Sequence, residues 1–117
     1  EAWLMGRGCE ATWYENTNKL VWIQKEDANA KAKSGIFSFD VAEKKSSVLH
    51  DDGPPWGHEY FPYITSDNRF LLYSASPHDQ HSHTSANYQI YLKDLKTGDV
   101  ERLNFDSFTN RWPKLLK

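Results

Sequence analysis

The sequence has little of several features that define large classes of proteins. It contains a single cysteine, Cys9, so no disulfide can form within the chain. Its six glycines are scattered, and none of them builds the glycine-rich loop that cradles a nucleotide phosphate. No apolar run approaches the roughly 18 residues that a membrane-spanning helix needs. We therefore expect no disulfide scaffold, no nucleotide site and no membrane insertion.

The net charge is also small. The chain has 117 residues, and its 14 basic and 16 acidic side chains give a formal net charge of -2. Surfaces that bind nucleic acid are strongly basic, so we expect no nucleic-acid partner. Aromatic side chains, in contrast, are plentiful at 15% of the residues, which predicts a packed core. The length suits one small domain or a part of a larger one.

An internal repeat is the most informative feature of the sequence. The segment 13–23 reappears about 50 residues later as 63–73, an alignment that matches Lys19 with Arg69. In both copies, asparagine-containing turn residues come directly before a short apolar run. This first block predicts that the two halves of the chain share one local structure.

A second block repeats in the same order. The segment 36–41 reappears as 90–95, and the spacing grows because the second copy has a longer loop, 76–87. Two matched blocks at nearly equal spacing indicate a duplicated unit. A period near 50 residues is typical of propellers and solenoids.

Each copy is expected to form four short β-strands. The runs 20–23 and 70–73 are apolar, as in buried strands. The runs 36–41 and 88–93 alternate between apolar and polar residues, as in strands with one face more exposed to solvent. The predicted strands are 11–14, 19–24, 35–41, 46–50, 61–65, 69–75, 88–95 and 99–104. The predicted fold class is therefore all-β, with two four-stranded antiparallel β-propeller blades.

The repeat resembles the TolB-like, WD-type β-propeller repeat. That pattern has a proline, a Ser-Pro-Asp-Gly turn, a basic residue and an apolar triplet, then an Ile-Tyr-x-x-Asp-Leu strand, a glycine turn and Arg-Leu-Thr. Residues 62–73 match its first half, and 90–98 with 102–104 match its second half. The first copy departs from the pattern at 14–18 and 42–45, where the family has its two turns. The resemblance implies the fold and says little about function.

The predicted boundaries place a strand of a neighbouring blade on either side of two blades. Residues 1–8 are expected to form the edge strand of a preceding blade, 9–56 the first blade, 57–106 the second, and 107–117 the first strand of a following blade. Two blades alone leave apolar faces uncovered. We therefore expect a piece of a longer propeller, or a homo-oligomer that completes a ring. Two sheets packed in a non-propeller arrangement are the third alternative.

Three histidines in the longer loop of the second copy are candidate metal ligands. His78, His81 and His83 lie close together in the sequence, and imidazoles are preferred ligands of divalent transition metals. The alternative interpretation is a solvated polar surface loop. We expect no cofactor other than such a divalent metal ion.

The connector between the copies, 53–61, holds the candidate ligand-binding residues Trp56, His58 and Tyr60. Such side chains offer the stacking and hydrogen-bonding surface of carbohydrate sites and protein-binding hot spots. In the alternative interpretation, Trp56, Tyr60 and Phe61 pack between the blades as core. No catalytic residue is predicted. The sequence has no Gly-x-Ser-x-Gly elbow, so nothing in it supports a serine hydrolase.

Charged residues that recur in the repeat are expected to have structural roles. Asp40 and Asp94 occupy equivalent positions after a strand, where a carboxylate usually accepts hydrogen bonds from turn amides. Arg69, Arg102 and Arg111 are expected to pair with acidic neighbours at blade edges.

These observations predict a non-catalytic propeller module that displays the loops 24–35, 51–60 and 76–87 to a protein or carbohydrate partner. Self-association is the other expected interaction. The alternative function is a fragment of a metal-dependent propeller enzyme such as an oligosaccharide lyase, because such lyases use histidine-rich sites with a divalent metal. Related propellers are commonly exported, so the resemblance implies the periplasm or cell envelope.

Overall fold

The computed structural model describes residues 8–25, 34–51, 56–77 and 88–104. No helix, and so none long and apolar enough to cross a membrane, occurs within these ranges. The strands are β1 (Gly8–Trp13), β2 (Lys19–Lys25), β3 (Ser34–Asp40), β4 (Lys45–His50), β5 (Trp56–Ile64), β6 (Phe70–Pro77), β7 (Gln89–Asp94) and β8 (Val100–Arg102).

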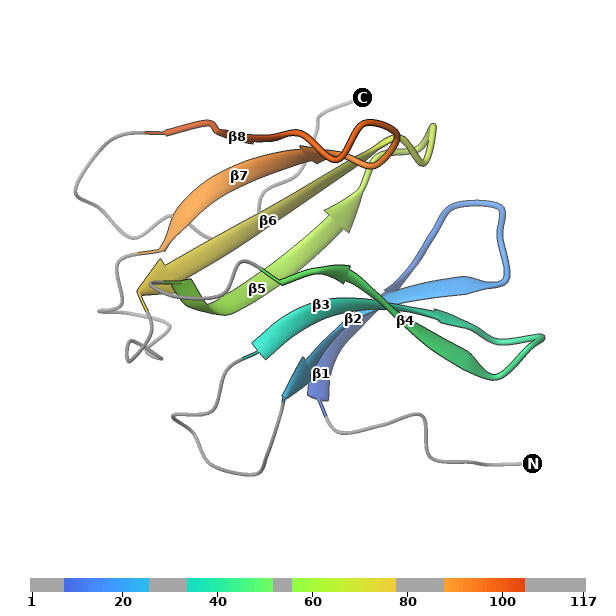
Figure 1. Cartoon of the computed structure of the whole chain (residues 1–117). Helices are drawn as coiled ribbons and strands as arrows, with labels where there is room; N and C mark the ends of the chain where they lie inside the picture. The colour runs from blue at the N-terminus through green and yellow to red at the C-terminus, as the bar shows by residue number, and fades with distance from the viewer. Residues whose placement is uncertain (1–7, 26–33, 52–55, 78–87, 105–117) are drawn as a thin grey trace.

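The strands form two four-stranded antiparallel sheets (Figure 1). Strands β1 to β4 pair in sequence order and form blade 1, and strands β5 to β8 do the same and form blade 2. One parallel pair, Ser34 on β3 opposite His58 on β5, joins the two sheets. Four antiparallel strands per sheet are the architecture of propeller blades, so the all-β prediction is confirmed.

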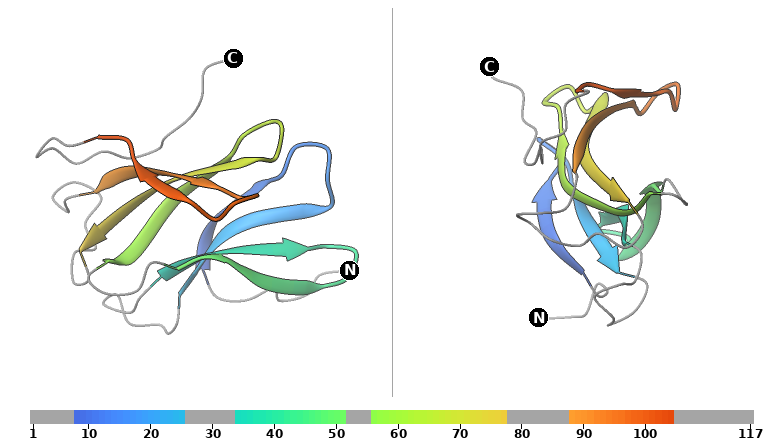
Figure 2. Two further views of the ribbon diagram at one scale, coloured as in Figure 1. Left: turned by 45° about the horizontal axis from the view of Figure 1, so that its top comes forward. Right: turned by 90° about the vertical axis from the view of Figure 1, so that its left-hand side faces the viewer.

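Tight turns and long connections lie at opposite ends of the strands. Connections alternate between the two ends of an antiparallel meander, and the parallel pair of β3 with β5 orients both blades alike. The turns 14–18, 41–44, 65–69 and 95–99 therefore share one end, here called the turn end. It is on the right in Figure 1 and in the left-hand view of Figure 2. The opposite end, where β3 and β5 begin, is called the connector end.

The hydrophobic core lies between the two blades. All its members are at most 9% exposed and form one cluster to which β2 and β3 contribute from blade 1, and β5, β6 and β7 from blade 2. They are Tyr14, Val21, Ile23, Ile36, Tyr60, Phe61, Ile64, Leu71, Tyr73, Ala75, Tyr88 and Tyr91. Full burial of one large apolar side chain contributes about 1.5–3 kcal/mol. This cluster is therefore the main force that holds the blades together.

Strand β5 begins earlier than the sequence predicted. Residues 51–60 were expected to be a loop and 61–65 a strand, but β5 starts at Trp56, because Trp56 pairs with Pro77 of β6 and His58 pairs with both Ser34 of β3 and Ser76 of β6. Its register shifts between Tyr60 and Tyr63, and Phe61 there has a φ of 55°. A bulge of this kind takes up an extra residue and allows pairing to continue.

The repeat is offset by one residue from the alignment that the sequence suggested. The backbone hydrogen bonds that close the first turn of each blade join the Tyr14 N–H to the Lys19 carbonyl and the Thr65 N–H to the Phe70 carbonyl, at 2.9 and 3.0 Å. Lys19 therefore corresponds to Phe70, and the predicted match with Arg69 was wrong.

Two different turns of the same length explain this error. In the first turn the left-handed residue is Asn16, with a φ of 58°, and in the second it is Asn68, also at 58°. Asn68 closes its turn by donating its N–H to Thr65, whereas in the first turn the corresponding donor is Thr17, one residue after Asn16. The alignment of 13–23 with 63–73 placed Asn18, which is not left-handed, opposite Asn68, and this match of unlike asparagines misaligned the strands that follow.

Candidate functional site

The predicted ligand-binding residues lie along β5 near the connector end. Trp56 and His58 belong to the strand, with their backbone opposite Pro77 and Ser76 of β6. Tyr60 is only 1% exposed. Tyr60 is thus enclosed by protein, whereas Trp56 and His58 occupy the first positions of the strand.

Tyr60 is part of an aromatic group within the core. Its ring centroid lies 5.9 Å from that of Phe61 and 6.0 Å from that of Tyr88. Burial is the largest cause that raises the pKa of the Tyr60 hydroxyl, with smaller contributions from Cys9 and Tyr88, and a hydrogen bond with Ser34 opposes them. The hydroxyl therefore stays protonated, and Tyr60 has the packing of a core residue.

Glu10 connects blade 1 to this part of β5. Its Oε2 accepts a hydrogen bond of 2.7 Å from the backbone N–H of Phe61. Glu10 and Phe61 both have positive φ, at 57° and 55°, and both lie where the strand register shifts. Nearby, Ser34 Oγ donates to the Glu59 carbonyl at 3.2 Å. No motif in the sequence pointed to Glu10, because it lies in the degenerate first copy and its partner is far along the chain.

A second polar contact joins β4 of blade 1 to blade 2. Lys93 Nζ donates to the Leu49 carbonyl at 2.9 Å and lies 3.4 Å from His50 Nδ1. The His50 ring packs against Tyr73, with 4.5 Å between ring centroids, and Tyr73 stacks on Tyr91 at 5.5 Å. The blades are therefore joined by directional contacts as well as by apolar burial.

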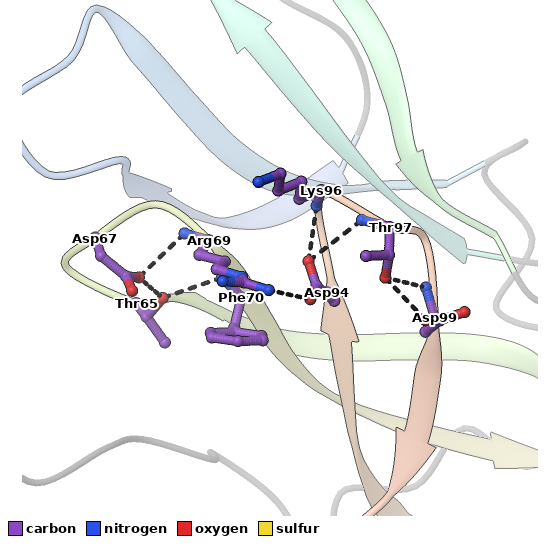
Figure 3. A network of polar contacts seen from close by, with 8 residues as sticks. All are labelled: Thr65, Asp67, Arg69, Phe70, Asp94, Lys96, Thr97 and Asp99. Carbon is purple, nitrogen blue, oxygen red and sulfur yellow. Dashed lines mark hydrogen bonds and ion pairs between the residues drawn. The ribbon is translucent and has the colours of Figure 1, made fainter.

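The recurring aspartates bond turn amides, as the sequence predicted. Asp94 Oδ1 accepts from the backbone N–H groups of Lys96 and Thr97, at 2.9 and 3.3 Å (Figure 3). Asp94 Oδ2 accepts from Arg69 Nη2 at 2.9 Å, which confirms the expected pairing of this arginine. Asp40 accepts from the turn amide three residues later at 3.0 Å. These carboxylates stabilise the turns and form no catalytic arrangement.

A similar set of bonds fixes the turn between β5 and β6. Asp67 Oδ1 accepts from the Thr65 hydroxyl and from the Arg69 N–H, while the Phe70 N–H donates to Thr65 Oγ1 (Figure 3). Hydrogen bonds, first from Thr65, lower the pKa of the Asp67 carboxyl. The hydrogen bond from Arg69 is the largest cause that lowers the pKa of Asp94. Both groups therefore stabilise the folded chain in their ionised form.

This arrangement predicts how stability depends on pH. A carboxyl with a lowered pKa in the folded state contributes fully above its unfolded pKa, about 3.9, and the contribution is lost as the pH falls through the folded value. We expect the difference in Tm between the wild type and Asp94→Asn to be constant from about pH 7 to pH 5 and to shrink below about pH 4. Thermal melts followed by circular dichroism measure it, and a difference that stays constant at low pH would contradict this role.

The metal-ligand candidates His78, His81 and His83 lie outside the described residues. Their segment follows Pro77 in the sequence, and the backbone of Pro77 is opposite Trp56. Within the described ranges, no group of three or more His, Cys, Asp and Glu side chains is arranged to hold a metal ion.

Comparison with known proteins supports the propeller interpretation of the fold. No protein-family model matches the chain. Among solved structures, the chain is similar to the crystal structure of TolB from Acinetobacter baumannii, with a TM-score of 0.64 and 20% sequence identity. The match covers 87% of this chain and 22% of that one. The two antiparallel sheets therefore have the fold of a TolB-like β-propeller fragment, as the repeat predicted.

Proposed function

We propose that the chain is a non-catalytic β-propeller module that binds a protein or carbohydrate partner at its connector end. The observation that carries the proposal is the separation of the two ends of the strands. Hydrogen-bonded tight turns occupy the turn end, while the strands that flank the longer connections begin or finish at the other end. Rigid scaffolds that present longer connections on one side are a recurring arrangement in binding proteins.

Within this proposal, Trp56 and His58 make the contacts and Tyr60 supports them. Trp56 and His58 start β5 and offer stacking and hydrogen-bonding groups. Tyr60 is buried between Phe61 and Tyr88, so its part is to hold the strand in place.

Binding assays with matched variants test this assignment. A glycan array and cross-linking capture from the source cells supply carbohydrate and protein candidates. We expect Trp56→Ala and His58→Ala to weaken binding of the recovered partner by about tenfold or more. Lys96→Ala, an exposed change at the turn end, is expected to leave it unchanged. Unchanged binding by both β5 variants, with the fold intact by circular dichroism, would refute the proposed site.

Self-association and an extracytoplasmic location complete the proposal. Gly8 starts β1 of blade 1, so we propose that residues 1–7, rather than 1–8, and residues 107–117 belong to neighbouring blades, supplied by a longer protein or by further copies in a homo-oligomer. The solution mass from light scattering distinguishes a monomer from a ring. The likeness to TolB supports a periplasmic or cell-envelope location, and cell fractionation tests it.

The metal-site prediction is tested by titration. We expect Zn²⁺ to bind the purified chain, with His78, His81 and His83 as ligands, and to bind the double variant His81→Ala/His83→Ala at least about tenfold more weakly. Isothermal titration calorimetry measures both affinities. Equal affinities would show that these histidines are not ligands. The alternative of a metal-dependent lyase finds no support in the comparison with TolB.

A further inference from the structure

Blade 1 has a second apolar face, on the side of its sheet that points away from blade 2. Residues that lie directly opposite each other on paired strands share one face of a sheet, and successive residues of a strand alternate between faces. Val21, Ile23 and Ile36 belong to the core between the blades, so their neighbours along the strands lie on the other face. The large apolar side chains of this outer face of blade 1 are Trp13, Leu20, Trp22, Phe37 and Phe39.

The internal repeat relates this outer face to the face of blade 2 that packs on blade 1. In the register set by the first turn of each blade, Trp22 corresponds to Tyr73 and Phe37 to Tyr91. Trp22 and Phe37 form an edge-to-face ring pair with 6.4 Å between centroids. The tyrosine pair is stacked at 5.5 Å and contacts His50 of blade 1 through Tyr73. The outer face of blade 1 thus has the aromatic pair of a face that packs on another blade.

Exposure is where the two faces differ. Trp13 corresponds to Ile64, since each lies directly before the first turn of its blade. Ile64, in the core between the blades, is 6% exposed, whereas Trp13 is 58% exposed. Leu20 and Phe37 are partly exposed, and the other two members of the outer face are buried. Exposed apolar groups of this kind mark protein contacts, and Trp13, Leu20 and Phe37 form the open part of the face.

Blade 2 has a complementary surface on its own outer side. On blade 1, the surface that packs on blade 2 includes Ile36 and Leu49, which the same register matches with Ile90 and Leu103. Ile90 alternates with Tyr91 of the core and so faces away from blade 1, and Leu103 is 48% exposed. The apolar side chains of this outer face of blade 2 are Tyr63, Leu72, Ile90, Leu92 and Leu103. Each chain therefore carries both halves of a contact between blades.

We propose that the outer face of blade 1 docks on the outer face of blade 2 of a second copy of the chain, head to tail. The proposal rests on the self-association proposed above and deepens it, because it names the two surfaces that meet. Trp13 takes the buried place that Ile64 has within the chain. A contact between two unlike surfaces leaves one of each unused, so copies add until a ring closes. Closed propellers have about four to eight blades, which corresponds to about two to four copies.

Complementary variants provide the test. Trp13→Glu and Leu103→Glu each place a carboxylate in one of the two outer faces, at a position that is exposed in the single chain. Burial of an unpaired carboxylate in an apolar contact is unfavourable, so each variant alone is expected to be monomeric by sedimentation velocity. The wild type is expected to have about two to four times the monomer mass. An equal mixture of the two variants is expected to form a dimer, because each keeps the face that the other has lost.

A control and a second pair of variants complete the experiment. Lys96→Glu, on a turn of blade 2, is expected to associate like the wild type. Circular dichroism checks the fold, and Trp13→Ser or Leu103→Ser replaces a glutamate variant that does not fold. The proposal is overturned by a monomeric wild type, by an oligomer that survives either variant, or by a mixture that stays monomeric. Solution mass reports on this contact and partner binding reports on the connector end, so either proposal can fail while the other stands.

Discussion

Replacing Tyr73 by alanine is expected to lower the free energy of unfolding by about 3–5 kcal/mol. Tyr73 lies in β6, is fully buried, and packs between His50 of blade 1 and Tyr91 of blade 2. Its removal leaves a cavity at the contact between the blades, which the surrounding strands cannot close without losing their pairing. Urea denaturation followed by circular dichroism measures the change.

An exposed valine provides the control for this experiment. Val48→Ala removes apolar atoms from a side chain that is 63% exposed, so the free energy of unfolding is expected to change by less than about 0.5 kcal/mol. If Tyr73→Ala were equally mild, the packing of the two blades through this residue would be disproved.

Replacing Glu10 by alanine is expected to cost about 1.5–3 kcal/mol of the free energy of unfolding. The change removes the acceptor of the Phe61 N–H, and Phe61 is only 4% exposed, so its N–H is left without this bond in a buried place. Hydrogen exchange gives a local readout, since the Phe61 amide is expected to exchange faster in the variant.

Two further variants distinguish the loss of this hydrogen bond from the loss of a negative charge. Glu10→Gln keeps an acceptor oxygen and is expected to retain part of the stability. Glu101→Ala removes an exposed carboxylate from β8 and is expected to have little effect. Unchanged protection of the Phe61 amide in Glu10→Ala would show that the cross-blade bond does not form in solution.

The strands could be predicted from the sequence because their signals are local. Short apolar runs such as 20–23 and 70–73, each preceded by turn residues, mark β2 and β6 without knowledge of any distant contact. The role of Asp94 was predictable for the same reason, because its amide partners lie two and three residues later.

The features that were missed depend on distant contacts. The early start of β5 follows from the pairing of His58 with Ser34, and the bond between Glu10 and Phe61 joins two separate blades. The residues that neighbour His58 and Glu10 in the sequence do not indicate these distant partners. The burial of Tyr60 is a similar case, because an aromatic residue in a strand looks the same in a core as at a binding surface.

The two blades pack face to face through one core. The most direct measurement is the nuclear Overhauser effect between ring protons of His50 on β4 and Tyr73 on β6, whose ring centroids lie 4.5 Å apart. We expect a strong cross-peak between these rings in the intact chain. If the spectra contained no cross-peak between any side chain of β1 to β4 and any of β5 to β8, the blades would not pack as described.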